Sequence, residues 1–78
     1  MKAILRGYKN LDFTTEKGDT VKGTKIFYGF TNEGVIGEEV AENFIRDDVL
    51  GKMELKIGGF INVEFSNKGK LIRIDRAD

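Results

Sequence analysis

One stretch of the chain interleaves cations, glycines and aromatic rings: Lys22-Gly23-Thr24-Lys25-Ile26-Phe27-Tyr28-Gly29-Phe30. Lysine ammonium groups neutralise phosphates, and an aromatic ring offers a nucleic-acid base a stacking surface worth about 1–3 kcal/mol. Glycines let a nucleotide backbone come close to a strand. The stretch therefore predicts contacts to a single-stranded nucleic acid, with Lys22, Lys25, Phe27 and Tyr28 as candidates. Its alternative is structural, with Ile26, Phe27 and Phe30 in the core and the lysines only keeping an edge soluble.

Phe27 and Tyr28 are adjacent, so on a strand their side chains point to opposite faces. A small barrel cannot bury both faces of a strand, so we expect one of the two rings outside. A phenol tolerates water better than a phenyl ring, which favours Tyr28 as the exposed, base-stacking residue. Both rings stay candidates for binding.

Three further cations are candidate phosphate contacts. Lys17 lies at the tip of an expected hairpin, and Arg73 and Arg76 lie on the last expected strand. Asp75 is close enough in sequence to pair with either arginine, so an ordinary surface ion pair is the alternative there.

The adjacent carboxylates Asp47 and Asp48 suggest a cation site or a general acid–base pair. Adjacent carboxylates at a turn are more often a helix cap and a solvated charge, and no spacing supplies a third ligand. We therefore expect no metal site and give a minimal hydrolase the lowest rank.

The 78-residue chain contains no Cys, His, Pro or Trp. Without Cys and His it cannot build a thiol nucleophile, a Ser-His-Asp triad, a zinc finger or an imidazole proton relay. A chain this short spends its apolar residues on one core and has little left for an enclosed cavity. We expect a non-enzymatic protein without cofactor or metal.

The 13 basic and 13 acidic side chains are unevenly placed along the chain. Residues 1–31 hold six basic and three acidic groups (+3), residues 32–54 two and seven (−5), and residues 55–78 five and three (+2). If the two ends meet in the fold, one face is basic. We expect cations of the second and last strands to share that face, with Glu38, Glu39 and Glu42 largely elsewhere. A mixed solvated surface is the alternative.

Alternation of apolar and polar residues, punctuated by glycine, predicts an all-β protein. We expect one domain over residues 1–78. Gly7 is expected to mark a bulge and Gly18 to lie in a hairpin turn, and Ile72 and Ile74 are expected on one face of the last strand. At most one short helical turn is expected within 47–57, capped by Asp47 or Asp48. The expected strands are 2–15, 20–31, 35–46, 60–65 and 70–76. Five strands this short favour a small antiparallel Greek-key barrel of the OB class, because closure removes exposed edges; an SH3-like barrel is the second choice.

No segment approaches the ~18 apolar residues that span a bilayer, and no apolar run follows the first basic residues. We expect a cytoplasmic location.

Two segments carry a resemblance: Phe13-Thr14-Thr15-x-x-Gly18-x-x-x-x-Gly23, and the terminal Gly69-Lys70-Leu71-Ile72-Arg73-Ile74-Asp75-Arg76. The chain resembles the helix-destabilising single-stranded-DNA-binding proteins of filamentous phages and related small proteins of phages and mobile elements. The family implies a five-stranded OB-like barrel, usually a symmetric dimer, that coats single-stranded DNA without chemistry. By the resemblance, Arg76 matches a DNA-contacting arginine, and Tyr28 shares the face parity of a stacking aromatic residue. The chain departs from the family's pattern at Glu16, Val21 and Lys68.

The sequence therefore predicts a sequence-tolerant single-stranded-DNA-binding homodimer, with RNA open as a second ligand. The alternative is a β-barrel module that binds another protein through the second strand.

Overall fold

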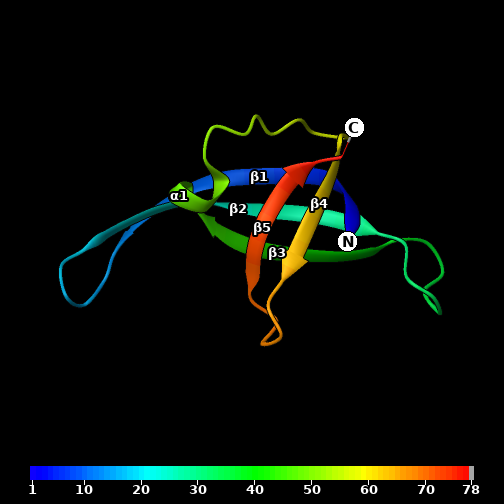
Figure 1. The fold of residues 1–78 in the computed structure, drawn as a ribbon, viewed down its shortest axis with the longest axis horizontal. Helices are drawn as coiled ribbons and strands as arrows, with labels where there is room; N and C mark the ends of the chain where they lie inside the picture. Colours follow the sequence, from blue (N-terminus) through cyan, green and yellow to red (C-terminus); the bar gives the residue numbers. More distant parts are fainter. Residues whose placement is uncertain (78) are drawn as a thin grey trace.

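The computed structural model describes residues 1–77, and across them the chain forms five antiparallel strands and one short helix (Figure 1). These elements are β1 (Lys2–Thr14), β2 (Thr20–Phe30), β3 (Glu39–Arg46), α1 (Asp47–Leu50), β4 (Phe60–Phe65) and β5 (Leu71–Arg76). The predicted all-β class, its five strands and its single helical turn are confirmed. The third strand begins later than expected, because Val35 turns back to donate a backbone hydrogen bond to Asn32 and Gly37 adopts a φ of +93°.

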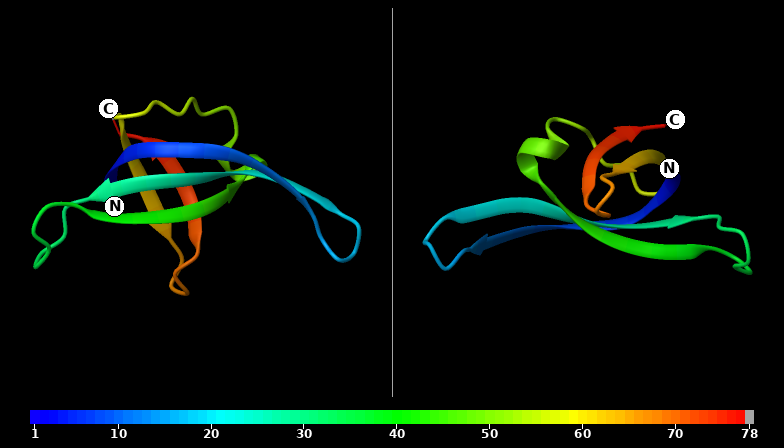
Figure 2. Two further views of the ribbon diagram at one scale, coloured as in Figure 1. Left: turned by 180° about the vertical axis from the view of Figure 1, so that it is seen from behind. Right: turned by 60° about the horizontal axis from the view of Figure 1, so that its bottom comes forward.

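The strands form one antiparallel sheet in the order β3-β2-β1-β4-β5. The sheet curls, so that the β4–β5 hairpin crosses over one face of the β1–β2–β3 part (Figures 1 and 2). The result is barrel-like, with β3 and β5 as the two ends of the strand order. Helix α1 contacts both of these end strands. The N-cap residue of α1 is Arg46, which makes no side-chain cap hydrogen bond, so the predicted aspartate cap is wrong.

The core lies between the β1–β2–β3 part of the sheet and the β4–β5 hairpin. Its buried residues are Ala3, Leu5, Ile26, Tyr28 and Ile45 from the first three strands, and Ile61, Val63, Leu71 and Ile74 from the hairpin. Burial of these apolar groups is the main force that holds the two parts together.

A bulge in β1 confirms the prediction at Gly7 and changes which residues face the core. Leu5 pairs with Tyr28 and Gly7 with Phe27, which leaves Arg6 as the extra residue. Before the bulge the odd-numbered residues Ala3 and Leu5 face the core. After it the even-numbered residues lie on the core side, because Tyr8 and Asn10 pair with the buried Ile26 and Thr24. Phe13 therefore points away from the core although it shares its parity with Leu5.

A second register shift explains why the prediction for the two faces of the last strand is wrong. The β4–β5 ladder shifts between Glu64 and Phe65, so that Phe65 pairs with Leu71. Leu71 and Ile74 are buried, and Ile72 is 52% exposed. The prediction that Ile72 and Ile74 share a face is wrong for this reason.

The hairpin of β1 and β2 extends beyond the core as an arm, whose tip lies at the left of Figure 1. Its turn is closed by two backbone hydrogen bonds, from Thr15 to Asp19 and from Gly18 to Thr15. Gly18 has a φ of +86°, as the turn requires.

Residues 1–77 contain one helix, α1, and it is too short to cross a membrane.

Candidate nucleic-acid interface

We call the side of β1, β2 and β3 that points away from the core the outer face. Paired residues on neighbouring strands point to the same side, so the strand register defines its members. Three cross-strand rows make up its centre: Gly7–Phe27–Glu42, Lys9–Lys25–Phe44 and Leu11–Gly23–Arg46.

Three phenylalanine rings lie on this face. Phe27 and Phe44 are half-buried, and Phe13 is 49% exposed. The Phe13 and Phe44 ring centroids are 5.7 Å apart and the ring planes are tilted by 55°, within the range of favourable aromatic contacts. The Phe44 ring lies across Gly23, where an added Cβ would overlap both the ring and the Ile45 carbonyl oxygen. Because Gly23 has no side chain, the Phe44 ring can lie over its backbone.

The cations of the outer face alternate with carboxylates. Lys25 Nζ lies 3.1 Å from Glu42 Oε1 and 5.9 Å from the centroid of the Phe27 ring. Arg46 Nε lies 3.5 Å from Asp48 Oδ1. Lys9 is exposed and makes no ion pair within residues 1–77. The face therefore presents rings beside cations, most of which hold a carboxylate.

An ion pair of Arg6 and Glu38 lies beyond Phe27 on the same side. The guanidinium donates two hydrogen bonds, from Nε to Oε1 at 3.1 Å and from Nη2 to Oε2 at 2.7 Å. Through these bonds Arg6 lowers the pKa of the Glu38 carboxyl, and Glu38 raises the pKa of Arg6. The Glu38 carboxylate fills the space that a side chain at Gly29 would occupy.

Glu38 and Glu42 thus both lie among the cations. The expectation that these acidic side chains lie elsewhere is wrong, because β3 pairs with β2 and brings Glu42 beside Phe27.

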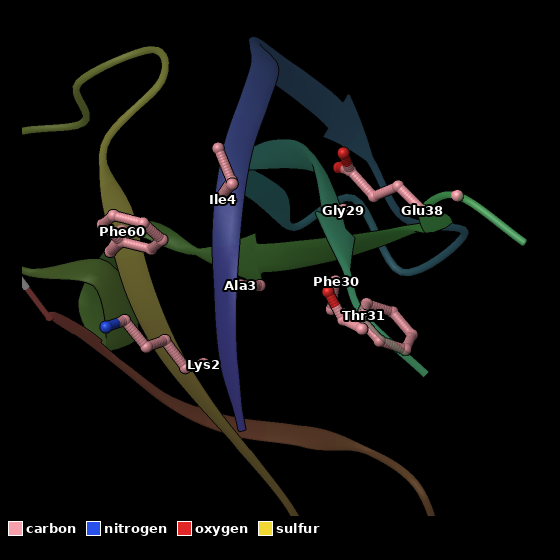
Figure 3. A pocket seen from close by; sticks show the side chains of 9 residues that line it. Lys2, Ala3, Ile4, Gly29, Phe30, Thr31, Glu38 and Phe60 are labelled. Carbon is pink, nitrogen blue, oxygen red and sulfur yellow. The ribbon is translucent and has the colours of Figure 1, made fainter. Parts of the chain in front are cut away.

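Two hollows lie beside these rings, and a third lies farther along the sheet. One of about 430 Å³ lies beside Phe13, Phe44 and Arg46. One of about 320 Å³ lies between Arg6, Phe27 and Val40. The largest, about 620 Å³, is lined by residues that include Lys2, Ile4, Gly29, Glu38 and Phe60 (Figure 3).

Tyr28 does not lie on the outer face. It is 2% exposed, packs in the core opposite Leu5 and Ala41, and its hydroxyl donates a hydrogen bond to Asn43 Oδ1. Burial raises the pKa of the phenol. The prediction of an exposed, base-stacking Tyr28 is wrong, because Asn43 satisfies the hydroxyl and Phe27 takes the outer position.

The other candidate cations do not gather at this site. Lys17 is exposed at the tip of the arm, and Lys22 lies on the arm opposite Asp12. Arg73 Nε pairs with Asp75 Oδ2 at 2.8 Å, the ion pair considered from the sequence.

Arg76 lies opposite Ile61, which in turn pairs with Ala3, whereas Lys22 lies near the other end of β1. The expectation of one continuous basic face made by the second and last strands is therefore wrong.

Sequence reasoning missed Lys9, Phe13, Phe44 and Arg46 as members of the site. The bulge at Gly7 was the available signal for Lys9 and Phe13, since it moves both to the outer face. Phe44 and Arg46 had no such signal, because their place depends on the pairing of β3 with β2.

Asp47 and Asp48 are both exposed, and residues 1–77 hold no group of three acidic, His or Cys side chains that could bind a metal ion.

Comparison with known proteins finds no matching family model, no matching curated protein and no matching solved structure.

Proposed function

We propose that the protein binds single-stranded DNA on the outer face, without sequence preference and without chemistry. The observation that supports the proposal is a group of rings and cations on one side of the sheet. The rings are Phe13, Phe27 and Phe44, and the cations are Lys9, Lys25 and Arg46. Rings that stack on any base, next to cations that neutralise phosphates, are the combination that single-strand binding requires. The resemblance of the first hairpin and the terminal run to phage single-strand-binding proteins points to the same ligand.

Binding requires the cations to exchange their carboxylates for phosphates. Exposed ion pairs such as Lys25–Glu42 and Arg46–Asp48 are worth only about 0–1 kcal/mol each, so the exchange costs little. Stacking on one ring contributes more, about 1–3 kcal/mol per base. Stacking therefore more than offsets the exchange, and because every base can stack, binding tolerates any sequence. We further propose RNA as a second ligand, a location in the cytoplasm and assembly as a homodimer.

The competing function is a protein-interaction module. It is favoured by exposed apolar side chains beside the same face, above all Val40 at 73% exposure. Salt separates the two functions. The logarithm of a single-strand affinity falls with the logarithm of salt concentration by about 0.7 per neutralised phosphate, whereas an apolar protein contact is almost insensitive to salt.

A fluorescence polarisation titration of labelled oligo(dT), repeated over a salt series, tests the proposal. We expect saturable binding that weakens as salt rises, with oligo(dA) and oligo(dT) bound in the same range. No binding to either oligonucleotide at low salt, with the protein folded, would overturn it.

Matched variants test the face. Phe27→Ala is expected to weaken binding about five- to 150-fold, whereas Phe65→Ala, which removes an exposed ring from β4, leaves it unchanged. Lys9→Gln is expected to lower the salt slope by about 0.7, and Lys56→Gln, on the 51–59 connection, to leave it alone. Equal effects from a test variant and its control would place the ligand elsewhere.

A further inference from the structure

The outer face continues onto a fourth strand through Phe60. Phe60 of β4 pairs with Ile4 of β1, and Ile4 pairs with Gly29 of β2, so the three lie in one cross-strand row. The neighbouring residue Ile61 is buried, whereas Phe60 is 41% exposed. Phe60 thus adds a ring outside the three strands that carry the proposed interface.

A cation accompanies this ring. Lys2 Nζ lies 4.4 Å from the centroid of the Phe60 ring, and the two side chains line one side of the largest hollow, about 620 Å³ (Figure 3). Ile4 and Glu38 border the same hollow: Ile4 pairs with Gly29, and the Glu38 carboxylate lies over Gly29. Ring, cation and open space repeat here the combination found around Phe27.

We propose that Phe60 and Lys2 form a second base-binding subsite for single-stranded DNA, which a strand reaches after crossing Gly29 from Phe27. This inference rests on the proposed function. The base stacks on Phe60, and Lys2 moves from the ring to the adjoining phosphate on its flexible stem. Stacking of a base is stronger than the interaction of a cation with an exposed ring, so the exchange favours the base.

The path between the two rings lies over Gly29. Its missing side chain leaves room for the strand once the Glu38 carboxylate moves aside. That movement frees the Arg6 guanidinium, whose two donors now hold Glu38, for a phosphate.

The two rings are too far apart to hold one base. Phe60 lies two strands across from Gly29, and Phe27 lies two residues along β2. Strand spacing and rise put the two positions about 12 Å apart. Only a strand of several nucleotides can occupy both, so the subsite predicts a dependence on oligonucleotide length.

The test compares wild type, Phe27→Ala and Phe60→Ala in polarisation titrations with oligo(dT) of increasing length. Phe27→Ala is expected to weaken binding at every length. Phe60→Ala is expected to bind the shortest oligonucleotides as wild type does and the longer ones about fivefold or more weakly. Lys2→Gln is expected to lower the salt slope with the longer oligonucleotides alone. Phe65→Ala serves as the control that is unchanged at all lengths.

Phe60→Leu keeps apolar bulk without the aromatic face, so it is expected to fold if Phe60→Ala does not and to show the same length dependence. A Phe60→Leu variant that matches wild type at every length, or loses affinity equally at every length, would overturn the inference while the proposed function stands. A wild-type protein that binds no oligonucleotide would overturn both.

Discussion

Lys25 on β2 and Glu42 on β3 form an ion pair in the middle of the outer face, with Nζ 3.1 Å from Oε1. The same ammonium group lies 5.9 Å from the centroid of the Phe27 ring. A carboxylate thus occupies the position beside a stacking ring where the proposed function requires a phosphate.

Glu42→Gln is therefore expected to strengthen oligo(dT) binding. The variant removes the competitor of the phosphate and one repulsive charge while keeping the shape of the side chain. An exposed ion pair is worth about 0–1 kcal/mol, so the gain is up to about fivefold in polarisation titrations at low salt. Glu54→Gln, on the connection before β4, makes the same change of charge away from the face and is the control. Equal gains from both variants would mean that net charge alone matters.

Tyr28→Phe is expected to reduce stability without reducing DNA binding. The change removes the hydrogen bond from the buried hydroxyl to Asn43 and leaves that amide oxygen unpaired, which lowers the free energy of unfolding by about 1 kcal/mol. Urea unfolding measures this loss, and oligo(dT) titration of the folded variant is expected to match wild type. A folded Tyr28→Phe variant that loses DNA affinity would show that Tyr28 takes part in binding after all.

The same residue gives a dependence on pH. Burial raises the pKa of folded Tyr28 above the ordinary value of 10.0, at which the phenol of the unfolded chain ionises. The stabilisation is complete below pH 10 and is lost as the pH rises through the folded pKa, because ionisation then favours the unfolded chain. Wild type is expected to lose stability faster than Tyr28→Phe in alkaline urea titrations. Parallel losses would exclude Tyr28 as the cause.

The strands could be predicted from the sequence because alternation and glycine turns are local signals. The faces of β2 could not. The alternation of Phe27 and Tyr28 fits either ring facing the core, and the greater polarity of tyrosine wrongly favours Tyr28 on the outside. Leu5 and Ala41 pack around Tyr28, and Asn43 Oδ1 accepts the hydrogen bond from its hydroxyl. These partners come from other strands.

The charge pattern failed for a related reason. The acidic segment 32–54 is separate in sequence, but the register of β3 on β2 places Glu42 next to Phe27. The Gly7 bulge was predicted, and it reverses the faces of β1 beyond it, which places Phe13 on the outer face.

Two glycines of the outer face are expected to respond differently to alanine. At Gly23 the new Cβ would overlap the Phe44 ring and the Ile45 backbone, so Gly23→Ala is expected to cost about 1–3 kcal/mol of unfolding free energy. At Gly29 the three atoms nearest the Cβ all belong to the Glu38 side chain, which is flexible and exposed and can turn away. Gly29→Ala is expected to stay within about 1 kcal/mol of wild type. Thermal or urea unfolding compares the two, and equal costs would contradict this account of the face.

The proposed homodimer is expected to form through β3 and the loop before it. Within residues 1–77, β3 pairs with β2 alone, so its other edge offers backbone donors and acceptors to a second chain. Ile36, in the loop before β3, is fully exposed, so a dimer through this edge would cover it. Sedimentation at tens of micromolar is expected to give a dimer, and Ile36→Lys a monomer. Ile72→Lys, at a 52% exposed position on β5, is the control that leaves the dimer intact. A wild-type monomer would remove the dimer, and dissociation by Ile72→Lys alone would move the interface to β5.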